Sequence, residues 1–300
     1  MTHAKILVVG SSNTDMVIKA DKLPAPGETV LGGTFFMNPG GKGANQAVAA
    51  ARLGGNVTFV AKVGNDIFGQ QALAQFQQEG ININYITVDA EQPSGVALIN
   101  VNAKGENCIA VAPGANGQLM PTDLAAALDS VAADTIVLLQ LEIPLTTVEY
   151  VIRKSYEKNV RVILNPAPAQ ILPPALFPLL YLITPNETEA ELLTGIRVTD
   201  PATAQKAANK LQSLGVANII ITLGAKGAWL HTSSWLGLIP APQVTATDTT
   251  AAGDCFNGAL AVALAENQYL AEAVAFACKA AAVSVTRLGA QASLPKRAEV

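Results

Sequence analysis

Short apolar runs rich in β-branched residues recur along the chain, at 6–9, 57–63, 136–139, 160–164, 180–184 and 219–223. Most of these runs are continuously apolar, which is typical of strands that are buried on both faces of a parallel sheet. Between them lie patterns of helical period, several of them closed by Gly or Asn, at 44–53, 70–79, 122–130, 146–159 and 201–214. Alternating strands and helices predict an α/β fold with a central, mostly parallel sheet flanked by helices.

Two segments break this alternation. Residues 15–37 contain a turn at 24–27, residues 94–112 contain a turn at 102–107, and both have the character of antiparallel hairpins. We therefore expect the chain, 1–300, to form a single α/β domain with a small β-sheet lid built from about 13–38 and 94–112. The successive Phe35, Phe36 and Met37 leave two alternatives open, packing against the main domain or a dimer interface.

The composition excludes several classes of protein. Half of the residues are hydrophobic and 14% are charged, which supplies a large core and argues against disorder. With 19 basic and 23 acidic residues and no run of Lys or Arg, a nucleic-acid partner is not expected. Three widely spaced cysteines fit neither a disulfide framework nor a zinc site, and two histidines argue against a histidine-rich metal centre.

The N-terminal sequence and the apolar stretches bear on location. The first apolar run has four residues and ends in glycine, unlike a signal peptide, and no apolar stretch approaches the roughly 18–20 residues of a membrane span. We expect a cytoplasmic protein with no membrane association.

Polar residues follow several predicted strands at the edge where open α/β sheets bind ligands. They are Asn13 and Asp15, Glu142, Asn165, Asn186, and the run Thr222, Leu223 and Gly224. The chain has no P-loop, no G-x-G-x-x-G and no nucleophile elbow. The sequence therefore indicates a ligand cleft that belongs to none of these common types.

Residues 248–254 place three small residues, Ala251, Ala252 and Gly253, where an apolar helix at 256–265 is about to begin; a second such helix is predicted at 270–285. Small side chains allow an anion to approach the free N–H groups of a helix start, and Asp254 would project beside it. A helix capped by Thr or Asp is the other interpretation. We expect the helix start to lower the pKa of Asp254, which makes it a weak base that still suffices for phosphoryl transfer.

Two further motifs have competing interpretations. Glycine-rich residues 39–45 would bring Lys42 and Asn45 close to a ligand, or form an ordinary loop-to-helix turn. Asn186 and Glu189 have the spacing of a capping box, although Glu189 could instead help to hold a divalent metal through water. Glu142 is either a hydroxyl acceptor or an ordinary loop carboxylate.

Residues 40–47, 186–189, 222–227 and 248–254, in this order, resemble the motifs of the ribokinase family of carbohydrate kinases. The resemblance covers essentially the whole chain. It implies ATP-dependent phosphorylation of the ribose 5-hydroxyl, with Mg²⁺ as a cofactor, a monovalent cation (K⁺) as an activator and a homodimer formed through the lid. A kinase for deoxyribose, fructose or another small sugar, or a nucleotide- or sugar-binding protein without catalysis, are the alternatives.

The same resemblance implies a role for individual residues. The sugar-site positions are Asn13, Thr14, Asp15, Gly41, Lys42, Gly43, Ala44, Asn45 and Glu142, with Asp254 as catalytic base and Ala251, Ala252 and Gly253 as the anion hole. The nucleotide-site positions are Asn186, Glu189, Thr222, Leu223, Gly224, Ala225, Lys226, Gly227, Gly253 and Cys278, and the cation-loop positions are Asp248, Thr250, Ser284, Arg287, Gly289 and Ser293.

Overall fold

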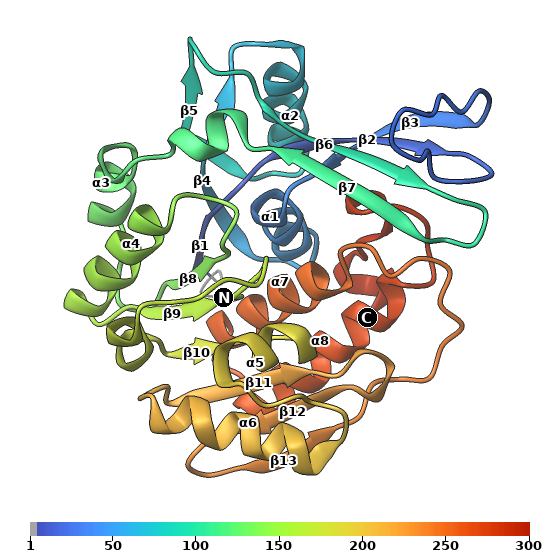
Figure 1. Ribbon diagram of the computed structural model, residues 1–300. Helices are drawn as coiled ribbons and strands as arrows, with labels where there is room; N and C mark the ends of the chain where they lie inside the picture. The colour runs from blue at the N-terminus through green and yellow to red at the C-terminus, as the bar shows by residue number, and fades with distance from the viewer. Residues whose placement is uncertain (1–4) are drawn as a thin grey trace.

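The computed structural model describes residues 5–300. Residues 1–4, the first part of the N-terminal segment that we compared with a signal peptide, lie outside the described residues. A nine-stranded sheet runs through the body in the order β13-β12-β11-β10-β9-β8-β1-β4-β5, parallel from β11 to β5 and antiparallel at β12 and β13 (Figure 1). This confirms the predicted mostly parallel sheet. The strands are β1 (Lys5–Val9), β4 (Asn56–Gly64), β5 (Asn82–Asp89), β8 (Ile136–Leu139), β9 (Arg161–Leu164), β10 (Leu182–Ile183), β11 (Asn218–Thr222), β12 (Ala228–His231) and β13 (Leu236–Ile239).

Helices cover both faces of this sheet, because successive side chains of each strand point to opposite sides. In β1, Ile6 and Val8 pack into a core with α1, α7 and α8, whereas Leu7 and Val9 pack into a second core with α3, α4 and α6. The α-helices are α1 (Lys42–Arg52), α2 (Ile67–Gln78), α3 (Pro121–Asp129), α4 (Leu145–Glu157), α5 (Glu187–Thr194), α6 (Pro201–Ser213), α7 (Ala252–Ala265) and α8 (Leu270–Ser284). The short 3₁₀ helices are η1 (Gly114–Gln118), η2 (Pro174–Leu179), η3 (Gly224–Lys226), η4 (Gln291–Ser293) and η5 (Arg297–Glu299).

A second, four-stranded sheet forms the lid and reaches out from the body (Figure 1). It consists of β2 (Asn13–Lys19), β3 (Thr34–Gly40), β6 (Gly95–Val101) and β7 (Asn107–Ala112), in the order β3-β2-β6-β7. The two predicted hairpins are both antiparallel, and the parallel pairing of β2 with β6 joins them into one sheet. At its base Asn13 pairs with Gly40 on one side and with Gly95 on the other.

The lid carries several large apolar side chains that nothing in the described chain covers: Ile18, Phe35, Met37, Leu98, Ile109 and Val111. The strand register places Ile18, Phe35, Met37 and Leu98 on one face, and Ile109 and Val111 on the other. Of the two alternatives for residues 35–37, the structure shows Phe35 and Met37 exposed rather than packed into the main core.

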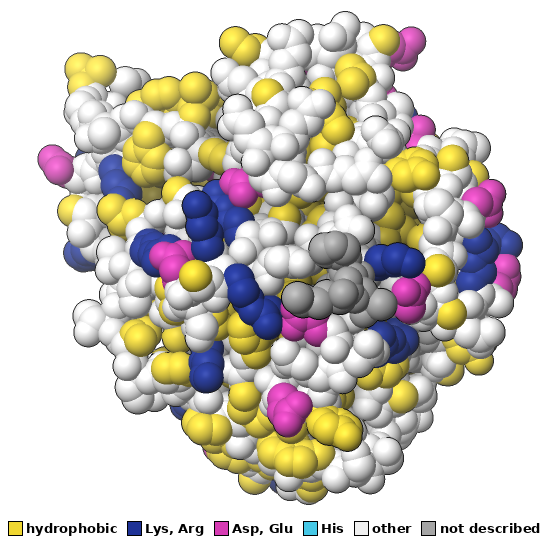
Figure 2. Space-filling view, turned by 180° about the vertical axis from the view of Figure 1, so that it is seen from behind, with side chains coloured by type: hydrophobic (Ala, Val, Ile, Leu, Met, Phe, Trp, Pro, Cys, Tyr) yellow, Lys and Arg dark blue, Asp and Glu magenta, His cyan; other side chains and the backbone are white. Residues whose placement is uncertain are grey.

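Among residues 5–300, no helix combines the length and the apolar character that crossing a membrane requires. Figure 2 shows one face of the molecule, on which basic and acidic side chains lie among apolar ones. Cys108, Cys255 and Cys278 are all free thiols.

Candidate active site

The glycine-rich loop at 40–43 folds tightly against the end of β1. Gly41 has φ 88°, and a Cβ built there would lie 2.7 Å from the backbone nitrogen of Asn13. A Cβ on Gly43 would lie 2.5 Å from the nitrogen of Ser11, and the Ala44 N–H donates to the carbonyl of Ser11 at 2.8 Å. Glycine is therefore required at both positions, by the positive φ at Gly41 and by the close approach at both.

Glu142 anchors this loop. Its Oε2 accepts hydrogen bonds from the Lys42 N–H at 3.0 Å and from the hydroxyl of Ser11 at 2.6 Å. The carboxylate thus satisfies an N–H at the start of α1, where no side chain of the adjacent sequence caps the helix. Ser11 was not among the predicted site residues; its hydroxyl donates to Glu142 and accepts from the Gly43 N–H at 3.4 Å, which gives Glu142 a second link to the loop.

Asn13 and Asp15 lie on the same face of β2, directly beside the glycine loop. The Nδ2 of Asn116, in η1, donates to Oδ1 of Asn13 at 2.8 Å, so Asn13 keeps its own amide N–H groups as donors for a ligand. A Cβ on Gly40 would collide with the carboxylate of Asp15, which therefore lies against bare backbone. Thr14 lies between them on the strand and faces the opposite side, so the structure does not bring it together with its neighbours.

The pKa of Asp15 is raised to about 6, chiefly by burial and also by the nearby carboxylates of Glu142 and Asp254, while Lys42 opposes the shift. Asp15 is therefore ionised at neutral pH and takes up a proton when the pH falls to about 6. Its position and charge make it a hydroxyl acceptor when ionised.

Asp254 is buried in the first turn of α7, with 6% of its surface exposed. Its Oδ2 accepts from Nδ2 of Asn45 at 2.9 Å and its Oδ1 from Nε2 of Gln46 at 2.9 Å. The expectation of a lowered pKa is wrong: burial raises the pKa of Asp254, and Lys42, Asn45 and Gln46 offset this only in part. Desolvation of the charged form thus outweighs the helix dipole, and Asp254 is a stronger base than the sequence suggested.

The ammonium of Lys42 interacts electrostatically with this carboxylate. Asp254 is the largest cause of its raised pKa; burial opposes the shift, and Glu142, Glu189 and Asp15 add to it. One ammonium group therefore lies among four carboxylates from different parts of the chain. A polyphosphate approaching this place needs further positive charge or N–H donors for its oxygens.

The start of α7 supplies such donors. Its N-cap, Ala251, has φ 59° and no side chain caps the helix, so the capped-helix alternative is not what the structure shows. A Cβ on Gly253 would meet nothing within 4 Å, and the first-turn backbone therefore borders open space. An anion can approach the unpaired N–H groups there, in the favourable field of the helix dipole.

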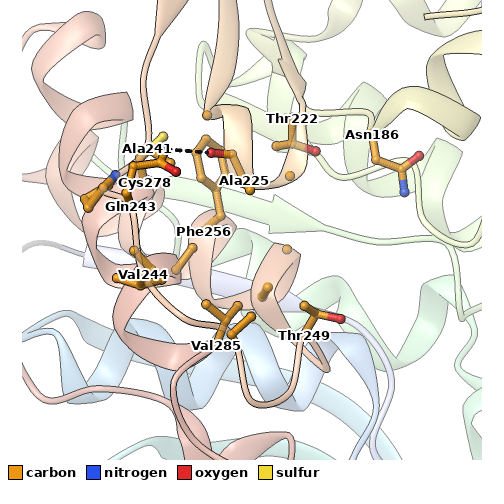
Figure 3. A pocket seen from close by; sticks show the side chains of 18 of the residues that line it. Asn186, Thr222, Ala225, Ala241, Gln243, Val244, Thr249, Phe256, Cys278 and Val285 are labelled. Carbon is orange, nitrogen blue, oxygen red and sulfur yellow. Dashed lines mark hydrogen bonds between the residues drawn. The ribbon is translucent and has the colours of Figure 1, made fainter. Parts of the chain in front are cut away.

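A pocket of about 330 Å³ opens beside this helix start (Figure 3). Asn186 and Thr222 lie together at one end, where their backbones form a parallel bridge; Cys278, Ala241 and Gln243 lie at the other. Of the expected nucleotide-site residues, the pocket is lined by Asn186, Thr222, Gly224, Ala225, Gly227, Gly253 and Cys278.

Three expected residues do not line it. Leu223 is buried in the core with α6, and the ammonium of Lys226 donates to the carbonyl of Thr199 at 3.1 Å. Glu189 is hydrogen-bonded to Asn186 and is not one of the residues that line the pocket. Ala252, expected in the anion hole, also lines the pocket. The pocket walls that were not among the predicted site residues are Glu187, Ala241, Pro242, Gln243, Val244, Ala246, Thr249, Phe256, Ala281, Ala282 and Val285.

Glu189 forms the capping box that its spacing suggested. Its two oxygens accept from the backbone N–H of Asn186 at 2.9 Å and from the Asn186 amide at 3.1 Å. No group of three or more His, Cys, Asp or Glu residues that could hold a metal ion occurs within residues 5–300. A single carboxylate still fits Mg²⁺, which is commonly held by one or two carboxylates together with phosphate oxygens and water.

The expected cation segments meet beside the start of α7. The Thr247 and Asp248 N–H groups donate to the carbonyl of Val285, and the Gly289 N–H donates to Oδ2 of Asp248 at 2.9 Å. Burial raises the pKa of Asp248, but hydrogen bonds from Thr250 and Gly289 outweigh it and the net direction is downward. The carboxylate of Asp248 therefore stays ionised at neutral pH, and an ionised carboxylate oxygen is a ligand that a monovalent cation can take.

The remaining cation-loop residues contribute differently. The guanidinium of Arg287 pairs with Glu299 at 2.6 Å, so only its carbonyl remains for a cation. The hydroxyls of Ser284 and Ser293 donate to the carbonyls of Ala281 and Ala290, which leaves their oxygen lone pairs available. The cation itself stays a prediction.

Proteins of known family are similar to this chain along nearly its whole length. The family model of the pfkB family carbohydrate kinases matches residues 3–297. The chain is 44% identical over 294 residues to a ribokinase of Haemophilus influenzae, covering 98% of this chain and 96% of the relative. It is 39% identical over 291 residues to a deoxyribokinase of Salmonella typhi, covering 97% of this chain and 95% of the relative.

Two solved structures are similar along nearly the full length. A crystal structure of ribokinase from Thermotoga maritima has a TM-score of 0.89 at 42% identity, covering 98% of this chain and 97% of the other. A structure of Arabidopsis thaliana ribokinase complexed with ribose and ATP has a TM-score of 0.88 at 33% identity, covering 99% and 97%.

The fold, the polar cluster around Asp254 and the match to the family together define a carbohydrate kinase, a phosphotransferase that uses ATP. The chain belongs to the pfkB carbohydrate kinase family and is most similar to its ribokinases.

Proposed function

We propose that the protein transfers the γ-phosphoryl group of ATP to the 5-hydroxyl of D-ribose, giving ribose 5-phosphate and ADP. The observation that carries the proposal is the meeting of Asp254, Asn45 and Lys42 at the uncapped start of α7, beside the pocket. The similarity to ribokinases along nearly the whole chain favours ribose as the sugar.

In this proposal the sugar lies between β2 and the glycine loop. Asp15 accepts from sugar hydroxyls, Asn13 donates to them through its amide, and Gly41 allows the backbone to approach closely. Such a set rejects a sugar that lacks the matching hydroxyl, because a buried polar group would be left unpaired.

Asp254 then acts as the base. It accepts the proton of the 5-hydroxyl while the hydroxyl oxygen attacks the γ-phosphorus. Because the transition state of phosphoryl transfer is loose, the base has to orient the hydroxyl and accept its proton late. The N–H groups of Gly253 and Asp254 and the ammonium of Lys42 receive the charge of the transferring group.

The nucleotide occupies the pocket between Asn186 and Cys278, with its phosphates directed at the start of α7. Bound Mg²⁺ would neutralise phosphate charge, with Glu189 as the carboxylate on its side of the site. A bound K⁺ beside Asp248 would hold the loop that precedes the anion hole. These assignments of residues are part of the proposal.

The chain would work as a single kinase domain, 1–300, with the lid of about 13–38 and 94–112 closing over the sugar. We further propose that two copies associate through the lid. Its exposed apolar side chains and its two unpaired edge strands, β3 and β7, support this, since exposed apolar sheets associate readily.

ADP release measured with ribose, deoxyribose and fructose tests the sugar assignment. We expect the highest kcat/KM with ribose. The similarity to a deoxyribokinase makes deoxyribose the second candidate, and a higher kcat/KM with it would replace ribose. A protein that binds ATP but releases no ADP with any of the three sugars would contradict the proposal.

A further inference from the structure

Behind Asp254 lies a buried chain of side-chain amides that the proposed reaction has not used. Gln46, which is fully buried, donates through Nε2 to Oδ1 of Asp254 at 2.9 Å and to Oδ1 of Asn165 at 3.0 Å. Its Oε1 in turn accepts from Nε2 of Gln140, also fully buried, at 2.6 Å. All polar atoms of the Gln46 side chain are therefore engaged, and the amide is held from both ends.

The direction of each hydrogen bond in this series of amides follows from the last bond of the series, which Asn165 donates to Thr184. Nδ2 of Asn165 donates to the carbonyl of Thr184 at 3.2 Å, and a carbonyl can only accept. Asn165 must therefore turn its oxygen to Gln46, and Gln46 must turn its NH₂ group to Asn165. The second hydrogen of that NH₂ group points at Asp254, so Oδ1 of Asp254 has to be an acceptor.

The other oxygen of Asp254 is in a different position. Oδ2 accepts from Nδ2 of Asn45, whose own Oδ1 is buried and has no hydrogen-bond partner within residues 5–300. Nothing fixes the orientation of this amide from behind. If Oδ2 carried a proton, the Asn45 amide could turn and accept from it through Oδ1.

We propose that Gln46 is a positioning residue of the phosphoryl transfer, which holds Oδ1 of Asp254 as a permanent acceptor and so directs the proton of the sugar hydroxyl to Oδ2. The inference rests on the proposed function, in which Asp254 is the base. It assigns Gln140 and Asn165 the task of holding Gln46.

The O–H bond of the sugar hydroxyl breaks and its proton goes to Oδ2, while the hydroxyl oxygen forms a bond to the γ-phosphorus. The bond from that phosphorus to the β,γ-bridging oxygen breaks, and its electron pair stays on ADP. Gln46 neither gains nor loses a proton, because its amide is a donor to Asp254 throughout.

The charges around Asp254 agree with this role. Burial raises its pKa, Lys42 lowers it, the amides of Asn45 and Gln46 lower it further, and Glu142 raises it. Asp15 and Glu189 are the other carboxylates that interact with it. Within residues 5–300 the Gln46 amide is the one hydrogen-bond donor to Oδ1, and it is fully buried, so it can stabilise the ionised base without occupying space open to the sugar.

The test is the pH dependence of kcat in Gln46→Met, which keeps the volume of the side chain and removes the donor. We expect kcat to fall about tenfold, as for loss of one hydrogen bond to a charged group. The acidic limb of the profile should move upward by about one pH unit. KM for sugar and for ATP should change little, because Gln46 touches neither.

Two further variants sharpen the test. Gln46→Glu preserves the shape and the bond from Gln140 but adds a second carboxyl beside Asp254, and should move the acidic limb further than Gln46→Met does. Gln140→Met leaves Asp254 untouched and frees Gln46, and should produce a smaller shift in the same direction. It also keeps the inference testable if Gln46→Met does not fold.

The control is Thr147→Val in α4. It removes another fully buried hydrogen bond, which the Thr147 hydroxyl donates to the carbonyl of Leu119 at 2.6 Å. It should lower thermal stability and leave the acidic limb in place. An unchanged kcat and acidic limb in folded Gln46→Met, while Asp254→Asn is inactive, would overturn the role of Gln46 alone. Full turnover in Asp254→Asn would instead overturn the assignment of the base.

Discussion

Asn45 and Asp254, 209 positions apart in the chain, share a buried hydrogen bond of 2.9 Å from Nδ2 to Oδ2. The glycine loop and the start of α7 therefore meet at the proposed base. Asp254→Asn should retain the fold and ATP binding and lower kcat at least about 10²-fold, the usual contribution of a positioned base. ADP release at saturating substrates measures this.

The matched control is Asp200→Asn. Asp200 caps α6 by accepting from the Thr203 N–H at 2.8 Å, outside the proposed site, and asparagine caps a helix about as well. Its kcat should equal that of the unmodified protein. Comparable losses in the two variants would mean that the effect at position 254 is not local.

The raised pKa of Asp15 makes sugar binding dependent on pH. Its pKa is about 6 in the folded protein against 3.8 for the free side chain, so it takes up a proton as pH falls through about 6 and ceases to be a full acceptor. KM for the sugar should therefore rise below about pH 6, with KM for ATP less affected. A KM for the sugar that is constant from pH 5 to 8 would refute this role.

The same shift predicts an effect on stability. A raised folded-state pKa favours folding below pH 3.8, and this contribution is lost as pH rises through about 6. Without ligand, Asp15→Asn should raise the free energy of unfolding by about 3 kcal/mol at pH 7.5. Urea unfolding should show this difference shrinking toward pH 4, while the variant binds the sugar more weakly.

Gly253 offers a way to obstruct the anion hole without disturbing the core. A side chain there meets open space, so Gly253→Ala should fold normally and place a methyl group where the phosphate oxygens approach. We expect kcat/KM for ATP to fall about tenfold or more, the effect of displacing one oxyanion donor being at least this large. In Gly117→Ala, where a Cβ would make only ordinary contacts at 3.6 Å, the value should be unchanged.

Association through the lid is testable by light scattering. We expect a dimer at micromolar concentration. Leu98→Asp and Ile109→Asp place a charge on opposite faces of the lid, and the variant whose face lies in the interface should become monomeric, because a buried unpaired charge is costly. A monomeric wild-type protein, or two variants that both remain dimeric, would refute the proposed interface.

Activation by a monovalent cation is testable with kinase assays in potassium, sodium and a bulky organic cation at constant ionic strength. Ordering of the loop at Asp248 and Thr250 should raise kcat in potassium, because these residues precede the anion hole. Asp248→Asn should blunt the difference between salts. Equal rates in all three would end the cation-site assignment and leave the kinase assignment intact.

The continuous apolar runs identified β1, β4, β8, β9 and β11 because these strands are buried on both faces, and burial of that kind is visible in the sequence. The 180–184 run also marked a strand, although only Leu182–Ile183 is one. The edge strand β5 was missed because its residues are only partly buried and lack a continuous apolar run.

The site was predictable only where a motif marks it. Glycines, caps and strand-end polar residues indicated the loop at Gly41, the capping box at Asn186 and the start of α7. The pocket walls at Val244 and Val285 are apolar and carry no motif. The direction of the pKa shift of Asp254 depends on burial produced by distant segments, which local spacing does not reveal.

The base of the lid has a consequence for the fate of ATP. Asn13 pairs there with Gly40 and Gly95, so the base of the lid includes the backbone of a proposed sugar ligand. If the lid closes over the sugar as proposed, its movement displaces the groups that hold the acceptor, and a bound acceptor then favours the closed position. Water, which makes too few of these contacts to close the lid, is thereby a poor competitor for the phosphoryl group, and hydrolysis of the nucleotide without sugar should be slow.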